Sequence, residues 1–248
     1  MNPQIHLPSL SKTNKIIIGT YVSVFILSNI LSKASGISLV SVLGLSYLDV
    51  LNGHIYQLIT FPIVDASFTG VLFNSILIWF LGSELEQKWG SFFYLKFLCV
   101  ATYSSGLFYF ILSLSVGNSV GVIPLYGLAG TMLSMILAYG IIYSERVMLF
   151  MLIFPMKAKY FCMILGAIEL FMALFSNQSN AAWSHIVAMI SAYLFLKYKS
   201  LQSRGVTLKA IKEQRHRDKM KSKLTLIKDD VQESNQSKAD PENPKYWQ

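Results

Sequence analysis

The sequence predicts an all-α membrane protein, a bundle of six transmembrane helices with a long interfacial first outer loop. Two observations predict this class. Hydrophobic residues make up 53% of the 248 residues and charged residues only 14%, whereas a soluble domain is about 25% charged. Long apolar runs follow one another between residues 61 and 195, and the sequence turns polar after residue 197. This pattern is typical of an integral membrane protein.

Six apolar segments approach the length of about 20 residues that a helix needs to cross the hydrocarbon core. The expected spans are residues 15–33, 67–86, 91–115, 126–144, 159–177 and 182–198. The first is interpreted as a retained span and not as a cleaved signal peptide. The fourth is rich in small residues, which let helix backbones approach closely. We therefore expect the fourth span in the middle of the bundle.

Lys and Arg near the span ends indicate the orientation, because cytoplasmic loops are enriched in them. With six spans, nearly all of these residues fall on one side: Lys12, Lys15, Lys88, Lys96, Arg146, Lys157, Lys159, Lys197 and Lys199. The opposite side has only Lys33 near a helix end. Both termini are therefore predicted to be cytoplasmic.

Two apolar segments are poor candidates for spans. Residues 34–66 are interrupted by Ser, Gly and Asp, which predicts an interfacial, partly helical loop. Residues 147–156 are apolar but too short to cross a membrane. We expect an interfacial or re-entrant piece there.

The chain divides into a cytoplasmic N-terminus (1–14), a membrane domain (15–198) and a basic, largely disordered cytoplasmic tail (199–248). Residues 197–248 hold 13 of the 21 Lys and Arg and seven of the 13 Asp and Glu, so they carry +6 of the formal net charge of +8. The tail is either a solvated extension or attracted to anionic lipid headgroups, with residues 205–228 as a basic, weakly amphipathic helix. Nucleic-acid binding is not expected, because the aromatic residues lie in the hydrophobic part.

Polar side chains inside a span are functional candidates because they are costly in lipid. Asn74, Glu169 and His185 lie within the second, fifth and sixth predicted spans. Each is either a functional group or a side chain bonded to a neighbouring helix, and the sequence offers Glu169 no partner. Cys99 and Cys162 lie in apolar runs without a metal-ligand pattern, so we expect buried cysteines and neither a metal nor a cofactor.

The stretch from Gly53 to Gly106 resembles the characteristic region of rhomboid intramembrane proteases. It begins with GHIYQLITF and continues into DASFTGVLFNSILIWFLGSELEQKWGS. The family pattern of LFN, an aromatic-rich run, Gly, Glu and Gly corresponds to Asn74, Gly82, Glu86 and Gly90. FPMKAKYF before the fifth span and SHIVAMISAYLF in the sixth resemble bacterial rhomboids. The resemblance covers about residues 15–198 and implies a rhomboid-like bundle in a bacterial cytoplasmic membrane.

The resemblance also implies a chemistry. In the family, a serine in a G-x-S-G motif opens the fourth helix and is activated by a histidine on the sixth helix. A histidine and an asparagine on the second helix hold the oxyanion, and a donor of this kind contributes a factor of about 10² to 10³ in rate. His185 and Asn74 match the base and the asparagine. Gly127 and Gly130 match the glycines that allow close packing beside the site.

The match fails at the reacting groups. Ala129 occupies the nucleophile position, and a methyl group cannot attack a carbonyl. Gly70 occupies the position of the oxyanion histidine, and Asp65 that of a second family histidine. The tryptophan–arginine pair of the outer loop corresponds to Tyr56 and Gln57.

Two alternatives concern the lost nucleophile. An engineered knockout would change one residue, so the further changes at Gly70 and Asp65 favour a natural loss. A displaced nucleophile is the second alternative. At about 100° per residue, Thr131 and Ser134 point about 160° and 140° away from Ala129, and neither hydroxyl is expected to face His185. Tyr126 lies nearby, but a phenol is a poor nucleophile for peptide bonds.

Three functions follow for this sequence. The leading hypothesis is a rhomboid pseudoprotease that binds transmembrane segments of client proteins within the lipid bilayer. The alternative is an active rhomboid serine endopeptidase that cuts such segments. A small transporter, with Asn74, Glu169 and His185 along its path, is a weaker alternative, because the chain shows no internal repeat of the kind that many transporters carry.

Overall fold

The computed structural model describes residues 9–116, 123–150, 154–176 and 179–200. The contacts divide the chain into two units, Met1–Leu196 and Lys197–Gln248, and almost all described residues belong to the first. The predicted basic helix and the disordered end of the tail lie outside the described residues. The predicted orientation in the membrane stays a prediction.

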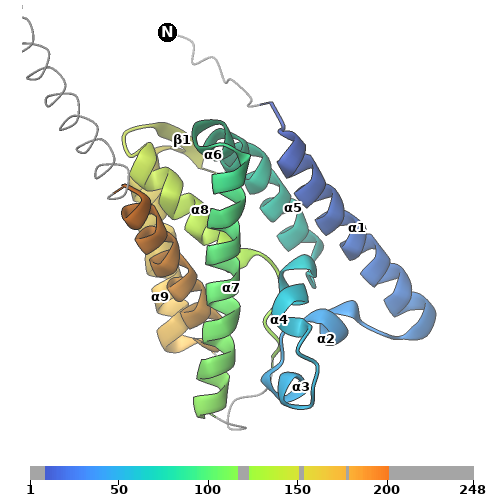
Figure 1. Cartoon of the computed structure of the whole chain (residues 1–248). Helices are drawn as coiled ribbons and strands as arrows, with labels where there is room; N and C mark the ends of the chain where they lie inside the picture. Colours follow the sequence, from blue (N-terminus) through green and yellow to red (C-terminus); the bar gives the residue numbers. More distant parts are fainter. Residues whose placement is uncertain (1–8, 117–122, 151–153, 177–178, 201–248) are drawn as a thin grey trace, which may run out of the picture. The chain divides into compact units, whose positions relative to one another are not determined.

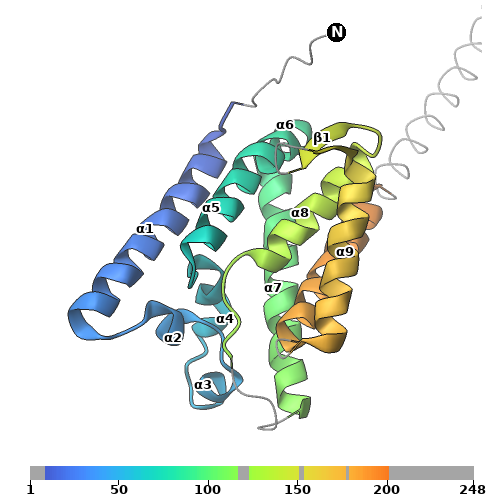
Figure 2. The same cartoon turned by 180° about the vertical axis from the view of Figure 1, so that it is seen from behind.

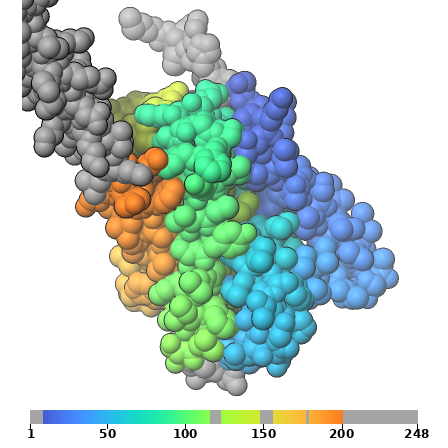
Figure 3. Space-filling view, viewed as in Figure 1, coloured from blue at the N-terminus to red at the C-terminus, as the bar shows by residue number. Residues whose placement is uncertain are grey.

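The first unit is a helical bundle (Figures 1 and 2). Its long helices are α1 (Lys12–Ser35), α5 (Phe68–Leu77), α6 (Ser83–Trp89), α7 (Ser91–Val116), α8 (Ala129–Ile142), α9 (Ala158–Phe175) and a last helix over residues 179–200. A π-helical turn, η2 (Ile78–Gly82), joins α5 to α6, so that one continuous helix runs through all three. On the face seen in Figure 3, α7 in green separates the last helix in orange from the blue N-terminal part.

Among the described residues, four helices are long and apolar enough to cross a membrane: Lys12–Ser35, Phe68–Trp89, Ser91–Ser115 and Ala158–Phe175. The fourth predicted span is a shorter apolar helix, α8, with 14 residues. At 1.5 Å per residue it is about 21 Å long, less than the hydrocarbon core of about 30 Å. The last helix is not among the four. The structure therefore supports a helical membrane protein and leaves the predicted count of six spans unconfirmed.

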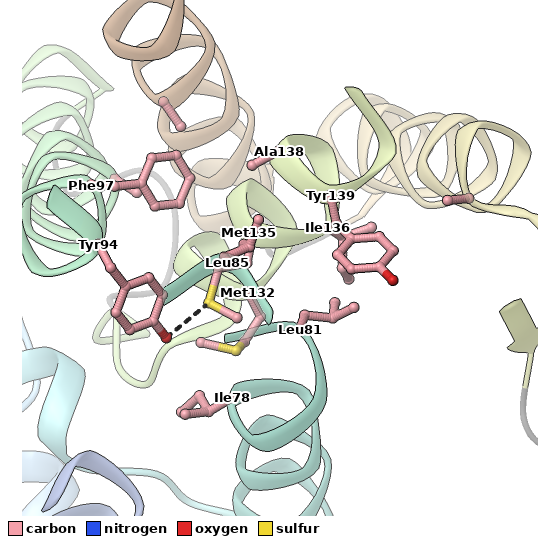
Figure 4. Packing of buried hydrophobic residues seen from close by; sticks show 13 residues of the cluster. Ile78, Leu81, Leu85, Tyr94, Phe97, Met132, Met135, Ile136, Ala138 and Tyr139 are labelled. Atoms are coloured by element: carbon pink, nitrogen blue, oxygen red, sulfur yellow. Dashed lines mark hydrogen bonds between the residues drawn. The ribbon is translucent and has the colours of Figure 1, made fainter. Parts of the chain in front are cut away.

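Helix α8 lies in the centre of the bundle, as its small residues predict. Nine of its 14 residues are buried, and it packs against α5, η2, α7 and α9. Met132, Met135 and Ile136 of α8 meet Tyr94 and Phe97 of α7 in the largest hydrophobic cluster (Figure 4). The Tyr94 hydroxyl lies 3.8 Å from the Met135 sulfur.

The first outer loop is partly helical, as predicted. It contains α2 (Leu39–Leu43), α3 (Tyr47–Leu51), α4 (Gln57–Thr60) and a 3-10 turn, η1 (Phe61–Ile63). The fully buried Gln57 holds these turns together. Its side-chain oxygen accepts from the Ser46 amide at 3.0 Å, and its nitrogen donates to the Val42 carbonyl and the Asp49 carboxylate, both at 3.2 Å.

A short antiparallel hairpin follows α8. Strand β1 (Val147–Phe150) pairs with β2 (Phe154–Lys157), with Val147 opposite Lys157. Residues 147–150 and 154–156, within the segment expected to be interfacial or re-entrant, therefore belong to a hairpin. The candidate membrane spans are all α-helical, as predicted. Beside the hairpin, hydrogen bonds from Lys157 and Lys159 lower the pKa of the exposed Glu145 to about 2.

Replacing Gly140 by Val is expected to lower the stability of the bundle by about 1–3 kcal/mol, because added methyl groups overpack a tight contact. A Cβ at Gly140 would lie 2.9 Å from the Cβ of Cys162 on α9. Thermal unfolding in detergent measures the effect. Gly19→Val on α1 is the matched control, since nothing lies within 4 Å of a Cβ there. Equal losses in both variants would show that contact with α9 is not the cause.

Candidate functional site

The first outer loop fixes the segment that leads into α8. Leu125 forms an isolated antiparallel bridge with Leu45, with N···O distances of 2.8 and 2.9 Å. Two residues later, the Gly127 amide donates to the Phe61 carbonyl at 3.0 Å. Gly127 has a φ of 79°, which favours glycine over any other residue. The extended segment then turns into α8, whose first residue is the half-buried Ala129.

His185 lies against the start of α8. A Cβ added to Gly130 would be 3.1 Å from the His185 ring carbon Cδ2 and 3.3 Å from the Ala188 Cβ. Gly130 therefore lets the last helix approach α8 closely. The ring nitrogen Nε2 is bonded to Cδ2, so this edge of the ring faces the beginning of α8.

Glu169 is the partner of His185. Its Oε1 on α9 lies 2.5 Å from the Nδ1 of His185, and each side chain is 16% exposed. The sequence offered Glu169 no partner, so the structure adds this contact. A carboxylate at Nδ1 fixes the orientation of an imidazole and leaves Nε2 available. The arrangement resembles the histidine–carboxylate half of a catalytic triad.

Asn74 belongs to a second polar group, in which three side chains form a chain of hydrogen bonds. The Asn74 amide donates to the Tyr21 hydroxyl at 3.1 Å, and this hydroxyl donates to Asp65 Oδ2 at 2.6 Å. The backbone amide of Ser67 donates to Asp65 Oδ1 at 2.9 Å. The sequence placed Asp65 in the outer loop and did not indicate Tyr21. Asp65 corresponds to a family histidine, and this correspondence was the one signal that could have marked Asp65, and through it Tyr21, as site residues.

The Asp65 carboxylate fills the space beside two glycines of the predicted site. A Cβ on Gly70 would lie 2.8 Å from Asp65 Oδ2, and a Cβ on Gly127 would lie 3.2 Å from it. A side chain at position 70 would therefore collide with the carboxylate. The absence of a side chain at Gly70 therefore makes space for the Asp65 carboxylate in its present position.

The structure thus brings the predicted residues into two groups. Gly70 and Gly127 lie beside Asp65, and Asn74 is linked to it through Tyr21. Gly130 lies against His185. Ala129 lies in the sequence between Gly127 and Gly130. The proposed displaced nucleophiles are engaged elsewhere. Thr131 lies 2.7 Å from the Thr102 hydroxyl, and Ser134 donates to the Gly130 carbonyl at 2.8 Å.

The two cysteines differ in burial. Cys162 is partly buried and Cys99 is exposed, so the expected burial of Cys99 within the chain is wrong. Within the described residues, no three His, Cys, Asp or Glu side chains gather as metal ligands.

Replacing Tyr21 by Phe is expected to destabilise the protein by about 1–3 kcal/mol, because the Asp65 carboxylate and the Asn74 amide lose a buried partner. Chemical unfolding in detergent measures the change. Tyr193→Phe, at an exposed position of the last helix, is the matched control. A coupling energy near zero in a double-mutant cycle of Tyr21→Phe with Asp65→Asn would contradict the hydrogen bond as the cause.

The sequence model of a family described as "Eukaryotic integral membrane protein (DUF1751)" matches residues 15–230. No curated protein matches the chain significantly. The match supports a protein embedded in the lipid bilayer. Because the family is described as eukaryotic, the prediction of a bacterial-type protein in a bacterial cytoplasmic membrane is not supported.

Proposed function

The chain belongs to the DUF1751 family of eukaryotic integral membrane proteins, and we propose that it is a rhomboid-like pseudoprotease. In this proposal it binds transmembrane segments of client proteins and does not cut them. The observation that carries the proposal is the contact between His185 and the start of α8, where the residue at the nucleophile position is Ala129. Alanine has no nucleophilic group, so no acyl-enzyme can form at this position.

The surroundings of Asp65 support the same conclusion. A tetrahedral intermediate needs donors aimed at its developing negative charge. Here Gly70 has no side chain to donate, and one of the two N–H groups of the Asn74 amide is bonded to Tyr21. The nearby Asp65 carboxylate would repel an oxyanion. The loss of activity therefore involves the stabilising groups as well as the nucleophile.

Binding of client segments is supported by the exposed apolar surface of the outer helices. In α1 and α9, only 11% of the most apolar 18-residue window is buried within the chain. Large side chains such as Ile26, Leu27 and Phe171 are exposed. Such surfaces can contact lipid or the transmembrane helix of another protein.

We expect neither the native chain nor Ala129→Ser to cleave a generic rhomboid substrate helix in liposomes. Restoring the hydroxyl leaves the histidine donor at position 70 absent, and one missing donor alone lowers the rate by a factor of about 10² to 10³. Cleavage is followed by gel, with an active rhomboid protease to verify the substrate. Cutting by the native chain that stops in His185→Ala would overturn the pseudoprotease proposal. Efficient cutting by Ala129→Ser alone would overturn the role given to Asp65.

Binding without cleavage predicts that single-span helices carrying a photo-crosslinker are captured by the reconstituted protein. Capture by the native chain and by His185→Ala should be equal within error, because binding does not use the base. An unrelated multi-span membrane protein at the same density provides the background. Capture no higher than this background would argue against client binding.

A second candidate function, an active serine endopeptidase, is favoured by the pairing of His185 with Glu169. Catalytic triads orient their histidine in this way. Covalent labelling by a fluorophosphonate probe would support activity, and loss of labelling in Ser134→Ala would identify the nucleophile. The hydrogen bond from Ser134 to the Gly130 carbonyl favours the pseudoprotease.

A further inference from the structure

We propose that Asp65 is a recognition group for client helices that carry a Lys or Arg inside their membrane span. The inference rests on the proposed binding of transmembrane segments and adds the chemistry that selects among them. It follows from the burial of the carboxylate against α1, from its lack of a basic partner and from the exposed residues that follow it.

The Asp65 carboxylate is buried against α1. Its partner Tyr21 is the tenth of the 24 residues of α1, which places it about 14 Å along a helix of about 36 Å. Its neighbour Asn74 is the seventh residue of α5, about 9 Å from the beginning of that helix. Asp65 itself comes three residues before the first residue of α5. It meets α1 at Tyr21, within the candidate span Lys12–Ser35.

Asp65 has no basic partner within the part of the chain that the structure describes. Carboxylates in ion pairs there are Glu84 with Arg146, Glu145 with Lys157 and Lys159, and Glu169 with His185. The groups that bond Asp65 are Tyr21 and Ser67, which are neutral. Buried charges are normally paired, because neutral donors do not offset the full desolvation of an ion.

The hydrogen bonds around Asp65 are all donated to its carboxyl oxygens. Asn74 donates to Tyr21, and Tyr21 donates to the carboxylate. The two bonds run in the same direction, from Asn74 through Tyr21 to Asp65 Oδ2. Bonds aligned in this way polarise one another, so each becomes stronger. The backbone amide of Ser67 donates to the other oxygen. All of these donors are neutral, so none of them compensates the charge of a carboxylate.

An incoming side chain would reach Asp65 from the side of the exposed residues that follow it, because the space beside Gly70 and Gly127 is filled by the carboxylate itself. Residues 66–69, which follow Asp65 directly, are exposed, and Asn74 is partly exposed. Asp65 itself is 9% exposed. A long, flexible Lys or Arg side chain from a neighbouring helix fits this geometry better than a bulky group.

Charge complementarity favours a basic group over a hydroxyl or an amide. All three can donate a hydrogen bond, but only Lys and Arg neutralise the carboxylate. A basic residue in the middle of a client span is itself unfavourable in lipid. The pair removes both unfavourable charges, whereas an apolar client helix would leave Asp65 as it is.

The experiment uses the full chain in liposomes with two single-span Leu/Ala helices that differ at one mid-span position, Lys or Met. Binding is measured by photo-crosslinking over a range of helix densities. We expect the Lys helix to bind about ten-fold more tightly than the Met helix, a size typical of polar contacts between helices in a membrane. In Asp65→Asn, which keeps the shape of the side chain, this ratio should fall to about one. Glu145→Gln, at an exposed carboxylate, should leave the ratio unchanged.

A further probe carries its Lys at the end of the span, where the side chain reaches the interface, and should show no preference. Equal binding of the mid-span Lys and Met helices to the native chain would overturn the inference while leaving client binding intact. A Lys preference that persists in Asp65→Asn would also overturn it. Binding of neither helix above background would overturn the proposed function as well. Melting curves of each variant in detergent show whether it is folded.

Discussion

The close approach of helices to α8 is the constraint on which the other features depend. Two glycines of α8 lie where neighbouring helices would collide with a side chain: Gly140 against Cys162 of α9, and Gly130 against His185 of the last helix. Small residues allow such packing where helices associate without a hydrophobic driving force. Both neighbours are thereby held against α8. Glu169 on α9 and His185 on the last helix contact each other directly, at 2.5 Å.

The sequence predicted the helices better than their ends. Apolar runs located every long helix, and the small residues of the fourth span correctly predicted that α8 is central. The start of this helix was predicted at residue 126, but α8 begins at Ala129. The bridge of Leu125 with Leu45 and the positive φ of Gly127 hold the preceding residues extended. These constraints come from a loop some 80 residues earlier in the chain, so no local pattern could indicate them.

The two polar contacts of the site differ in how far a sequence could predict them. Glu169 lies six residues before the end of α9 at Phe175, and His185 lies six residues after the start of the last helix at residue 179. Antiparallel helices bring such residues to the same level, so this contact could have been predicted. The contact of Tyr21 with Asp65 joins residues 44 positions apart. This contact depends on how the outer loop packs against α1, and a hydropathy pattern carries no information about that packing.

The substitutions at the proposed active site are physically linked. Asp65 occupies the volume into which a side chain at Gly70 would grow, so a histidine at position 70 would require Asp65 to move. The same carboxylate accepts from the hydroxyl of Tyr21, which in turn accepts from the Asn74 amide. A change at position 70 is therefore coupled to Asp65, Tyr21 and Asn74. A buried charge held by neutral donors is also less favourable than an apolar packing of similar volume. Such local departures from stability are characteristic of functional sites, and here the departure lies in Asp65, close to Gly70 and Gly127.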